Sequence, residues 1–124
     1  MNNFKLNEIE SVIKSTPDDA FTKELSSVIF SLGRDAENEE EYDYALSMLF
    51  LIFNRDNESV KAEVIQAFSL ISILKKEIKK LDVKIIEPLV HIAWSNAKSD
   101  KNKAKIKYSV EDINLNLNSN INLI

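Results

Sequence analysis

Carboxylates are concentrated in one short stretch of the chain. Between positions 35 and 44 the sequence places six acidic residues and two tyrosines: Asp35, Glu37, Glu39, Glu40, Glu41, Tyr42, Asp43 and Tyr44. A pair of carboxylates can perform acid–base chemistry on a glycosidic bond, but a pair alone does not define such a site. The cluster does create a local negative field, which suits a basic partner. Tyrosines are also enriched at interface hot spots.

We therefore predict that these eight residues form a partner-binding site. An alternative stays open, because the same stretch also fits a solvated loop followed by the first turn of a helix, where the helix dipole favours negative charge. In that alternative the acids have no partner, and at least one of the tyrosines belongs to the core.

The other ingredients of an active site are missing. His91 is the only histidine and the chain has no cysteine, so neither a zinc site nor a cysteine nucleophile can be assembled. A single glycine excludes a glycine-rich phosphate loop, and no serine has a histidine at motif spacing. The sequence predicts a protein that is not an enzyme and that binds no cofactor and no metal.

Composition indicates an all-α protein. With 124 residues, 44% of them hydrophobic, the chain is long enough for one domain with its own core. One glycine and two prolines are too few for the many tight turns of a β-sandwich or barrel. The first residues lack the pattern of a secretory signal, so we expect a cytoplasmic protein.

Capping residues divide the chain into one short helix and five main helices. Thr16-Pro17-Asp18-Asp19 is typical of a helix start, and Gly33 is placed to end that helix. Asn38 is a good cap for the next helix. The other expected elements are a short helix over 5–14, a helix capped by Asp56 or Asn57, a helix over roughly 84–97, and a helix capped by Ser99 or Asp100. Residues 75–80 either extend the third main helix or form a loop.

Apolar residues at spacings of three and four predict the buried face of each helix. The helix after Asn38 is apolar on nearly every side from Ala45 to Phe53, so we expect it to be central. The predicted buried stripes are Phe21, Leu25, Val28, Ile29 and Leu32; Val60, Val64, Ala67, Phe68, Ile71 and Leu74; Leu89, Ile92 and Ala93; and Ile106, Val110, Ile113 and Leu117. Residues 1–117 form one domain, and the Asn-rich residues 118–124 are expected to be a poorly ordered tail.

Weak internal repetition points to stacked helices. The pairs Ala45-Leu46, Ala67-Phe68 and Leu89-Val90 recur at intervals of 22 residues, so two helices span about 44 residues, as in HEAT and armadillo repeats. The segment 56–68 resembles the second helix of a HEAT repeat, although the Pro of the first helix is missing. The resemblance covers residues 20–117. It implies five to six antiparallel helices in a HEAT/armadillo-like right-handed stack, and an irregular helical bundle is the alternative.

Charge is divided along the chain. Residues 1–63 carry 14 acidic against 6 basic residues, a net charge of −8, and residues 64–124 carry 6 against 10, a net charge of +4. In stacked helices this asymmetry becomes a spatial dipole. The pI of about 5.1 argues against nucleic acid as the main ligand. No apolar run reaches the roughly 20 residues that cross a membrane.

The chain is similar in size, acidity and lack of catalytic groups to the small HEAT-like immunity proteins of bacterial contact-dependent growth inhibition and polymorphic toxin systems. The resemblance implies a cytoplasmic toxin inhibitor. Its partner would be a cognate protein toxin, basic and nuclease-like, bound by Asp35 to Asp43 in place of phosphate charges. The alternative is a helical-repeat adaptor or regulator that binds another protein through a concave groove.

Overall fold

The computed structural model describes residues 4–123 and contains six α-helices and no strand within that part of the chain. This confirms the predicted all-α class. Residues 1–3, at the start of the predicted domain, and Ile124, at the end of the predicted tail, lie outside the described residues. The helices are α1 (Leu6–Ser15), α2 (Lys23–Arg34), α3 (Glu39–Phe53), α4 (Glu58–Leu74), α5 (Val83–Asn96) and α6 (Asp100–Leu117).

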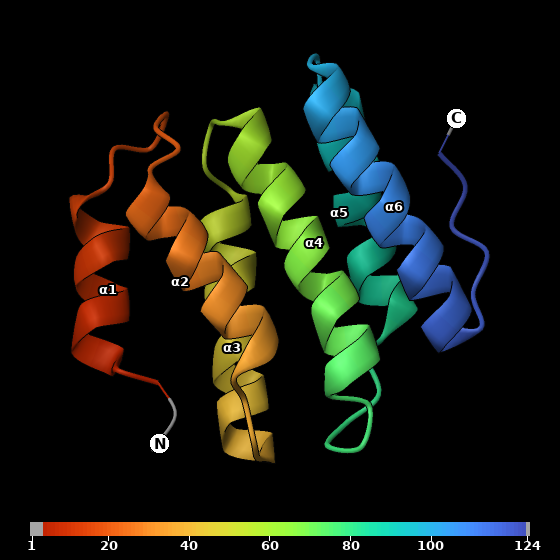
Figure 1. Cartoon of the computed structure of the whole chain (residues 1–124), viewed down its shortest axis with the longest axis horizontal. Coiled ribbons are helices and arrows are strands. Elements are labelled where there is room, and N and C mark those ends of the chain that lie inside the picture. The colour runs from red at the N-terminus through yellow and green to blue at the C-terminus, as the bar shows by residue number, and fades with distance from the viewer. Residues whose placement is uncertain (1–3, 124) are drawn as a thin grey trace.

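The helices form two layers, and successive helices run in opposite directions (Figure 1). Helices α2, α4 and α6 lie side by side in the front layer, α3 and α5 lie behind them, and α1 closes one end. Sequence position therefore follows position along the stack, from α1 at one end to α6 at the other. Because residues 1–63 are acidic and residues 64–124 are basic, the predicted charge asymmetry lies along the longest axis of the molecule.

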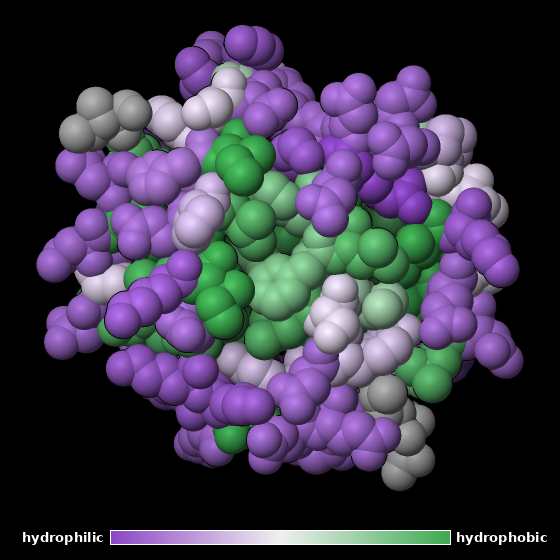
Figure 2. All heavy atoms as spheres, turned by 180° about the vertical axis from the view of Figure 1, so that it is seen from behind, coloured by the Kyte–Doolittle hydropathy of each residue, from purple (hydrophilic) through white to green (hydrophobic). Residues whose placement is uncertain are grey.

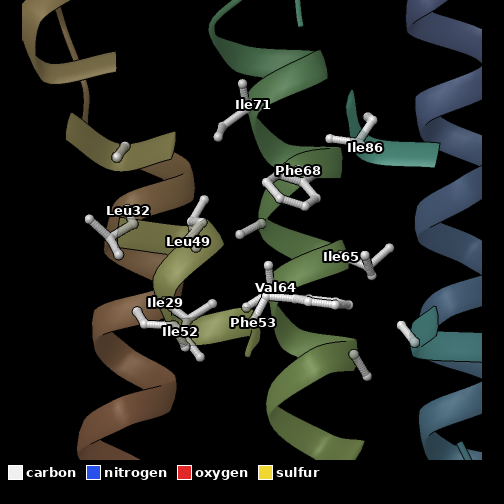
Figure 3. Close-up of a cluster of buried hydrophobic side chains, with 14 of the residues drawn as sticks. Ile29, Leu32, Leu49, Ile52, Phe53, Val64, Ile65, Phe68, Ile71 and Ile86 are labelled. Atoms are coloured by element: carbon white, nitrogen blue, oxygen red, sulfur yellow. The ribbon is translucent and has the colours of Figure 1, made fainter. Parts of the chain in front are cut away.

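The centre of the stack is α4, which packs against α2, α3, α5 and α6. Our expectation that the helix after Asn38 is central was wrong, because α3 lies in the rear layer and exposes 55% of Leu51. The apolar side chains of α4 fill the space between the layers. Figure 3 shows Val64, Ile65, Phe68 and Ile71 of α4 among Leu49, Ile52 and Phe53 of α3 and Ile29 and Leu32 of α2.

The start of α2 differs from the prediction. The helix begins at Lys23, and Thr22 is its cap, with the Thr22 hydroxyl accepting a hydrogen bond from the N–H of Leu25 at 3.1 Å. Thr16 instead follows the end of α1, where its hydroxyl donates to the carbonyl of Val12 at 2.6 Å. The Asp18 side chain and the Asp19 carbonyl hold the connecting loop, and the Asp19 carbonyl accepts from the side-chain amide of Asn57 at 2.9 Å. The N–H of Asp56 donates to the Asp18 carboxylate at 3.2 Å, which ties this loop to the start of α4.

Gly33 does not end α2, which continues to Arg34. Instead, Gly33 lies where α2 approaches α4 most closely. A Cβ on Gly33 would lie 3.0 Å from the Cα of Ala67, tighter than most Cβ contacts between packed helices, so the backbone of α4 would have to shift by a few tenths of an ångström. The glycine is therefore required for the contact between α2 and α4 rather than for a turn.

The remaining caps follow the sequence closely. Asn38, Asn57 and Ser99 each accept hydrogen bonds from backbone N–H groups in the first turn of the following helix. All four apolar residues predicted for α6 are buried, whereas α5 buries Ile86, Val90 and Ala93 and leaves Ile92 45% exposed. The stripe predicted for α5 was therefore partly wrong. Residues 75–82 form a loop, which is one of the two possibilities that the sequence left open for residues 75–80.

The C-terminal segment is held by one side chain of α6. The side-chain amide of Asn114 donates to the carbonyl of Ile121 at 3.0 Å, and the Asn114 side-chain oxygen accepts from the N–H of Ile121 at 2.8 Å. Asn118 ends the helix in the left-handed conformation, with φ 53°, and Ile121 is buried. Residues 118–123 thus have a specific anchor that the alternation of Asn with Leu and Ile did not predict.

Glu58 links two neighbouring helices. From the first turn of α4 its carboxylate accepts hydrogen bonds from the N–H groups of Lys98 and Ser99 and from the side-chain amide of Asn102, at the start of α6. These donors, the N–H of Lys98 foremost, hold the pKa of Glu58 below its ordinary value of 4.5, while partial burial acts in the opposite direction. The charged carboxylate is therefore the form that stabilises this contact.

The lowered pKa predicts a pH-dependent contribution of Glu58 to stability. The contribution is fully present above pH 4.5 and is lost as the pH falls through the lower pKa of the folded state. We expect Glu58→Gln to lower the urea midpoint at neutral pH and to have a progressively smaller effect at acidic pH, below 4.5. Glu111→Gln, on the exposed side of α6, is the matched control. An equal loss of stability by Glu58→Gln at both pH values would contradict the assignment.

Candidate functional site

The predicted acidic site lies around the start of α3, and part of it is buried. The Asn38 side chain caps the helix by accepting from the N–H of Glu41 at 2.9 Å. The Glu41 carboxylate turns back and accepts from the N–H of Glu37 at 2.9 Å, so this side chain is fully buried. Tyr42 is buried as well. Glu41 and Tyr42 therefore belong to the helix start and the core, and they do not offer their side chains to a partner.

Two of the exposed acids are engaged by a lysine of the same chain. Lys79, in the loop after α4, places its Nζ 3.2 Å from Glu39 Oε1 and 3.2 Å from Asp43 Oδ1. Hydrogen bonds to Asp43 and then to Glu39 raise the pKa of Lys79 above its ordinary value. This basic side chain shows that the two carboxylates can bind a cation together.

Asp35 is engaged by its neighbours at the end of α2. The Arg34 guanidinium donates to both oxygens of the Asp35 carboxylate, at 2.5 and 3.0 Å, and the Ser31 hydroxyl donates at 2.7 Å. The hydrogen bond from Arg34 is the main reason that the pKa of Asp35 lies below its ordinary value. Of the predicted acids, Glu37 and Glu40 have exposed side chains that make no ion pair in the described part of the chain.

The two tyrosines contribute rings to the interior. The Tyr44 ring packs against Phe4 with 5.8 Å between ring centroids, and Tyr42 lies beside the core of α3. Burial raises the pKa of both hydroxyls above the ordinary value. Neither hydroxyl has a hydrogen-bond partner among residues 4–123, although both oxygens are buried. A buried hydroxyl without a partner costs free energy, so these two groups lower the stability of the fold.

Tyr42→Phe should stabilise the protein. The substitution removes the unpaired hydroxyl and keeps the buried ring, so we expect the free energy of unfolding to rise by about 1 kcal/mol. Urea denaturation followed by circular dichroism measures the change. Tyr108→Phe, at an exposed position of α6, is the control and should leave stability unchanged. A loss of stability in Tyr42→Phe would mean that the hydroxyl has a partner.

The structure brings further acids to this end of the molecule. A cleft of about 450 Å³ lies between α1 and α2, and Glu8, Glu24 and Asp35 line it together with one lysine, Lys5. We call the acids of this cleft, Glu8, Glu24 and the partly buried Asp35, together with the exposed Glu37 and Glu40 that follow Asp35 in the chain, the acidic end. Glu8 and Glu24 were not among the predicted site residues, because they lie far from residue 35 along the chain. Asp35, Glu37 and Glu40, which belong to the predicted cluster, supply the rest of this surface.

Other charged groups are dispersed. Lys101, Lys103 and Lys107 are exposed on α6, at the opposite end of the stack. His91 lies on α5, where its Nε2 is 3.6 Å from the Glu87 carboxylate. Within residues 4–123 no group of three or more His, Cys, Asp or Glu side chains is arranged to hold a metal ion.

The rear layer exposes an apolar surface. Figure 2 shows it as a continuous hydrophobic area across the middle of the rear face, bordered by hydrophilic residues. Part of it is a pocket of about 280 Å³ between α3, α5 and the loop between α4 and α5, and we call this pocket the α3–α5 groove. Its lining residues are Tyr42, Asp43, Leu46, Phe50, Lys79, Lys80, Leu81, Asp82 and Ile85. Exposed apolar area of this kind commonly marks an interaction surface.

Comparison of the chain with protein-family models, with curated proteins and with solved structures finds no match. Among the helices of residues 4–123, none combines the length and the apolar character needed to cross a membrane.

Proposed function

We propose that this chain is a non-catalytic protein that binds a basic partner protein through its acidic end. The observation that carries the proposal is the cleft where carboxylates from α1 and α2 meet, with further exposed acids in the loop and helix turn that follow α2. Glu8 and Glu24 line the cleft with Asp35, and Glu37 and Glu40 follow in the next loop and helix turn. Acids on three separate elements offer a surface to which several lysines or arginines can bind. The capping of one helix start would not require so many acids.

The partner that best fits this surface is a cognate bacterial toxin with a basic, nuclease-like active site. In that case the chain is a cytoplasmic immunity protein, and its carboxylates occupy the positions that nucleic-acid phosphates take on the toxin. Glu39 and Asp43 are already paired with Lys79, so the exposed acids that make no ion pair, Glu37 and Glu40, are the members of the predicted cluster that such a toxin would contact. Opposite charges on the two surfaces would accelerate association, and salt would slow it.

The alternative, an adaptor or regulator that binds another kind of protein, is separated from immunity by a test in cells. Bacteria that express the product of the neighbouring gene should survive when this chain is co-expressed and should stop growing without it. Survival that depends on the chain supports immunity. Co-expression without protection, while the chain accumulates in folded form, contradicts immunity and leaves the adaptor function.

Replacing acids of the acidic end should weaken binding without unfolding the protein. Glu8, Glu24 and Glu37 are exposed, so changing all three to Gln should leave the helical circular dichroism intact. We expect the association rate to fall about tenfold at low salt. The control changes three exposed acids elsewhere, Glu77, Asp100 and Glu111, to their amides. Equal association rates for the two triple variants would remove the acidic end from the proposal.

A further inference from the structure

Helix α1 lies at one end of the stack, beside α2, and clefts flank it on two sides (Figure 1). The cleft of the acidic end lies between α1 and α2. A second cleft, of about 580 Å³, lies between α1 and α3. Its lining residues are Asn7, Glu10, Ser11, Ile13 and Lys14 of α1 and Met48 and Leu51 of α3. Helix α1 is therefore packed less closely than a helix inside the stack.

Helix α1 also buries little apolar surface. Ile9 is its one buried side chain, whereas every other helix buries at least three residues. A helix of ten residues is too short to be stable by itself in water, so α1 depends on its tertiary contacts. Segments with few buried apolar contacts open more readily than the rest of a fold. We therefore expect α1 to open more readily than α4.

One arginine binds the C-terminal end of α1. Arg55, in the turn between α3 and α4, donates from Nη1 to the carbonyl of Thr16 at 2.7 Å and to that of Pro17 at 3.3 Å. Its Nη2 donates to the carbonyl of Ile13, in the last turn of α1. The last carbonyls of a helix have no partner within the helix, and a positive charge is favoured beside them. Arg55 thus joins the end of α1 to the body of the stack.

The segments on either side of α1 have contacts of their own. Asp18 and Asp19 are hydrogen-bonded to residues at the start of α4, so the loop after α1 stays attached to the stack without Arg55. Before α1, Phe4 is buried and its ring packs on that of Tyr44. Once the contacts of Phe4 and Arg55 break, α1 can move about this loop while α2 to α6 keep their packing.

We propose that α1 opens as a unit from the end of the stack, and that Arg55 is the positioning residue that holds it closed. In the closed state Glu8 of α1 lines one cleft with Glu24 and Asp35 of α2. In the open state Glu8 leaves this cleft, so the acidic end is complete only while α1 is closed.

The opening of α1 regulates the acidic end. A basic partner that binds both walls of the cleft stabilises the closed state, because a ligand shifts a protein toward the state that it binds better. This link to binding rests on the proposed function, whereas the opening of α1 in the free chain does not.

Hydrogen exchange of the free wild-type chain, measured by mass spectrometry on peptides, tests the opening without any substitution. We expect the amides of α1 to exchange at least about tenfold faster than those of α4, which open only with the whole fold. Equal protection of α1 and α4 would overturn the proposal.

Arg55→Met tests the positioning role, because it removes the donors and keeps an apolar stem. We expect exchange in α1 to accelerate by about tenfold or more, since hydrogen bonds from a charged group are lost, while α2 to α6 stay unchanged. Phe4→Ala should act on the same helix. Arg34→Met changes the other arginine of the chain, which is exposed and bonds to Asp35, and as the matched control it should leave α1 unchanged. Equal acceleration in every helix, or none in α1, would overturn the role of Arg55.

Exchange in the complex separates this inference from the proposed function. When the purified product of the neighbouring gene is bound, we expect α1 to exchange at least about tenfold more slowly than in the free chain. A complex that leaves the exchange of α1 unchanged would overturn the link between α1 and the acidic end. The absence of a complex would contradict the proposed function, and exchange in the free chain would still decide whether α1 opens.

Discussion

Phe68→Ala should lower the free energy of unfolding by about 3 to 5 kcal/mol, because removing a large buried ring leaves a cavity that the surrounding helices only partly fill. Phe68 is fully buried on α4, the helix that contacts four others, and its ring packs against Phe50 of α3. Urea denaturation of the folded variant measures the loss. Phe30→Ala, at a 43% exposed position of α2, is the matched control and should cost far less. Equal losses at the two positions would mean that α4 is not the centre of the core.

Lys105→Met should destabilise the protein by about 2 to 3 kcal/mol, because it leaves the Glu63 carboxylate without its cation. Lys105 Nζ lies 2.7 Å from Glu63 Oε1, and the two side chains are only 19% and 12% exposed. The Ser26 hydroxyl donates to the same carboxylate oxygen at 3.5 Å, so the pair joins α2, α4 and α6 across the front layer.

The double variant separates the ion pair from packing. With Glu63→Leu added to Lys105→Met, no buried charge remains, and we expect most of the lost stability to return. Urea midpoints of the wild type, both single variants and the double variant give the coupling free energy. If the double variant is as unstable as the sum of the single variants, the ion pair has no role in the front layer.

Local signals predicted most of the helix boundaries. Asn38 caps its helix as predicted, and of the two candidates named for each of two later helices Asn57 and Ser99 are the caps, because a capping side chain bonds to N–H groups only two or three residues away. The same logic failed at Thr16-Pro17-Asp18-Asp19. There, Asp18 bonds to Asp56, a residue distant in sequence, and the local helix start is not formed. A tertiary contact outweighed the local preference.

The assignment of the central helix failed for a related reason. An uninterrupted apolar stretch in α3 suggested cover on every side, whereas part of it is the exposed wall of the α3–α5 groove. Hydrophobicity alone does not distinguish a residue buried in the core from one on an exposed interaction surface. Gly33 shows the same limit, because its need for a small side chain depends on Ala67 in another helix.

The candidate site was predictable only where it is continuous in sequence. The density of acids at 35–43 located one part of the acidic end, but Glu8 and Glu24 reach the same cleft through the packing of α1 on α2. The burial of Glu41 was hidden as well, since it depends on which side of α3 faces the core, whereas the burial of a tyrosine was expected in the alternative interpretation. Exposed members of the cluster remain candidates for binding, and the buried ones stabilise the helix start.

The proposed function requires that the acidic end binds a basic protein. Its most direct test is stopped-flow association of the purified chain with the purified product of the neighbouring gene, at low and high salt. We expect a one-to-one complex whose association slows steeply as salt rises, and slows again when Glu8, Glu24 and Glu37 are changed to Gln. No complex at low salt, or an association rate that neither salt nor the triple substitution alters, would contradict the account.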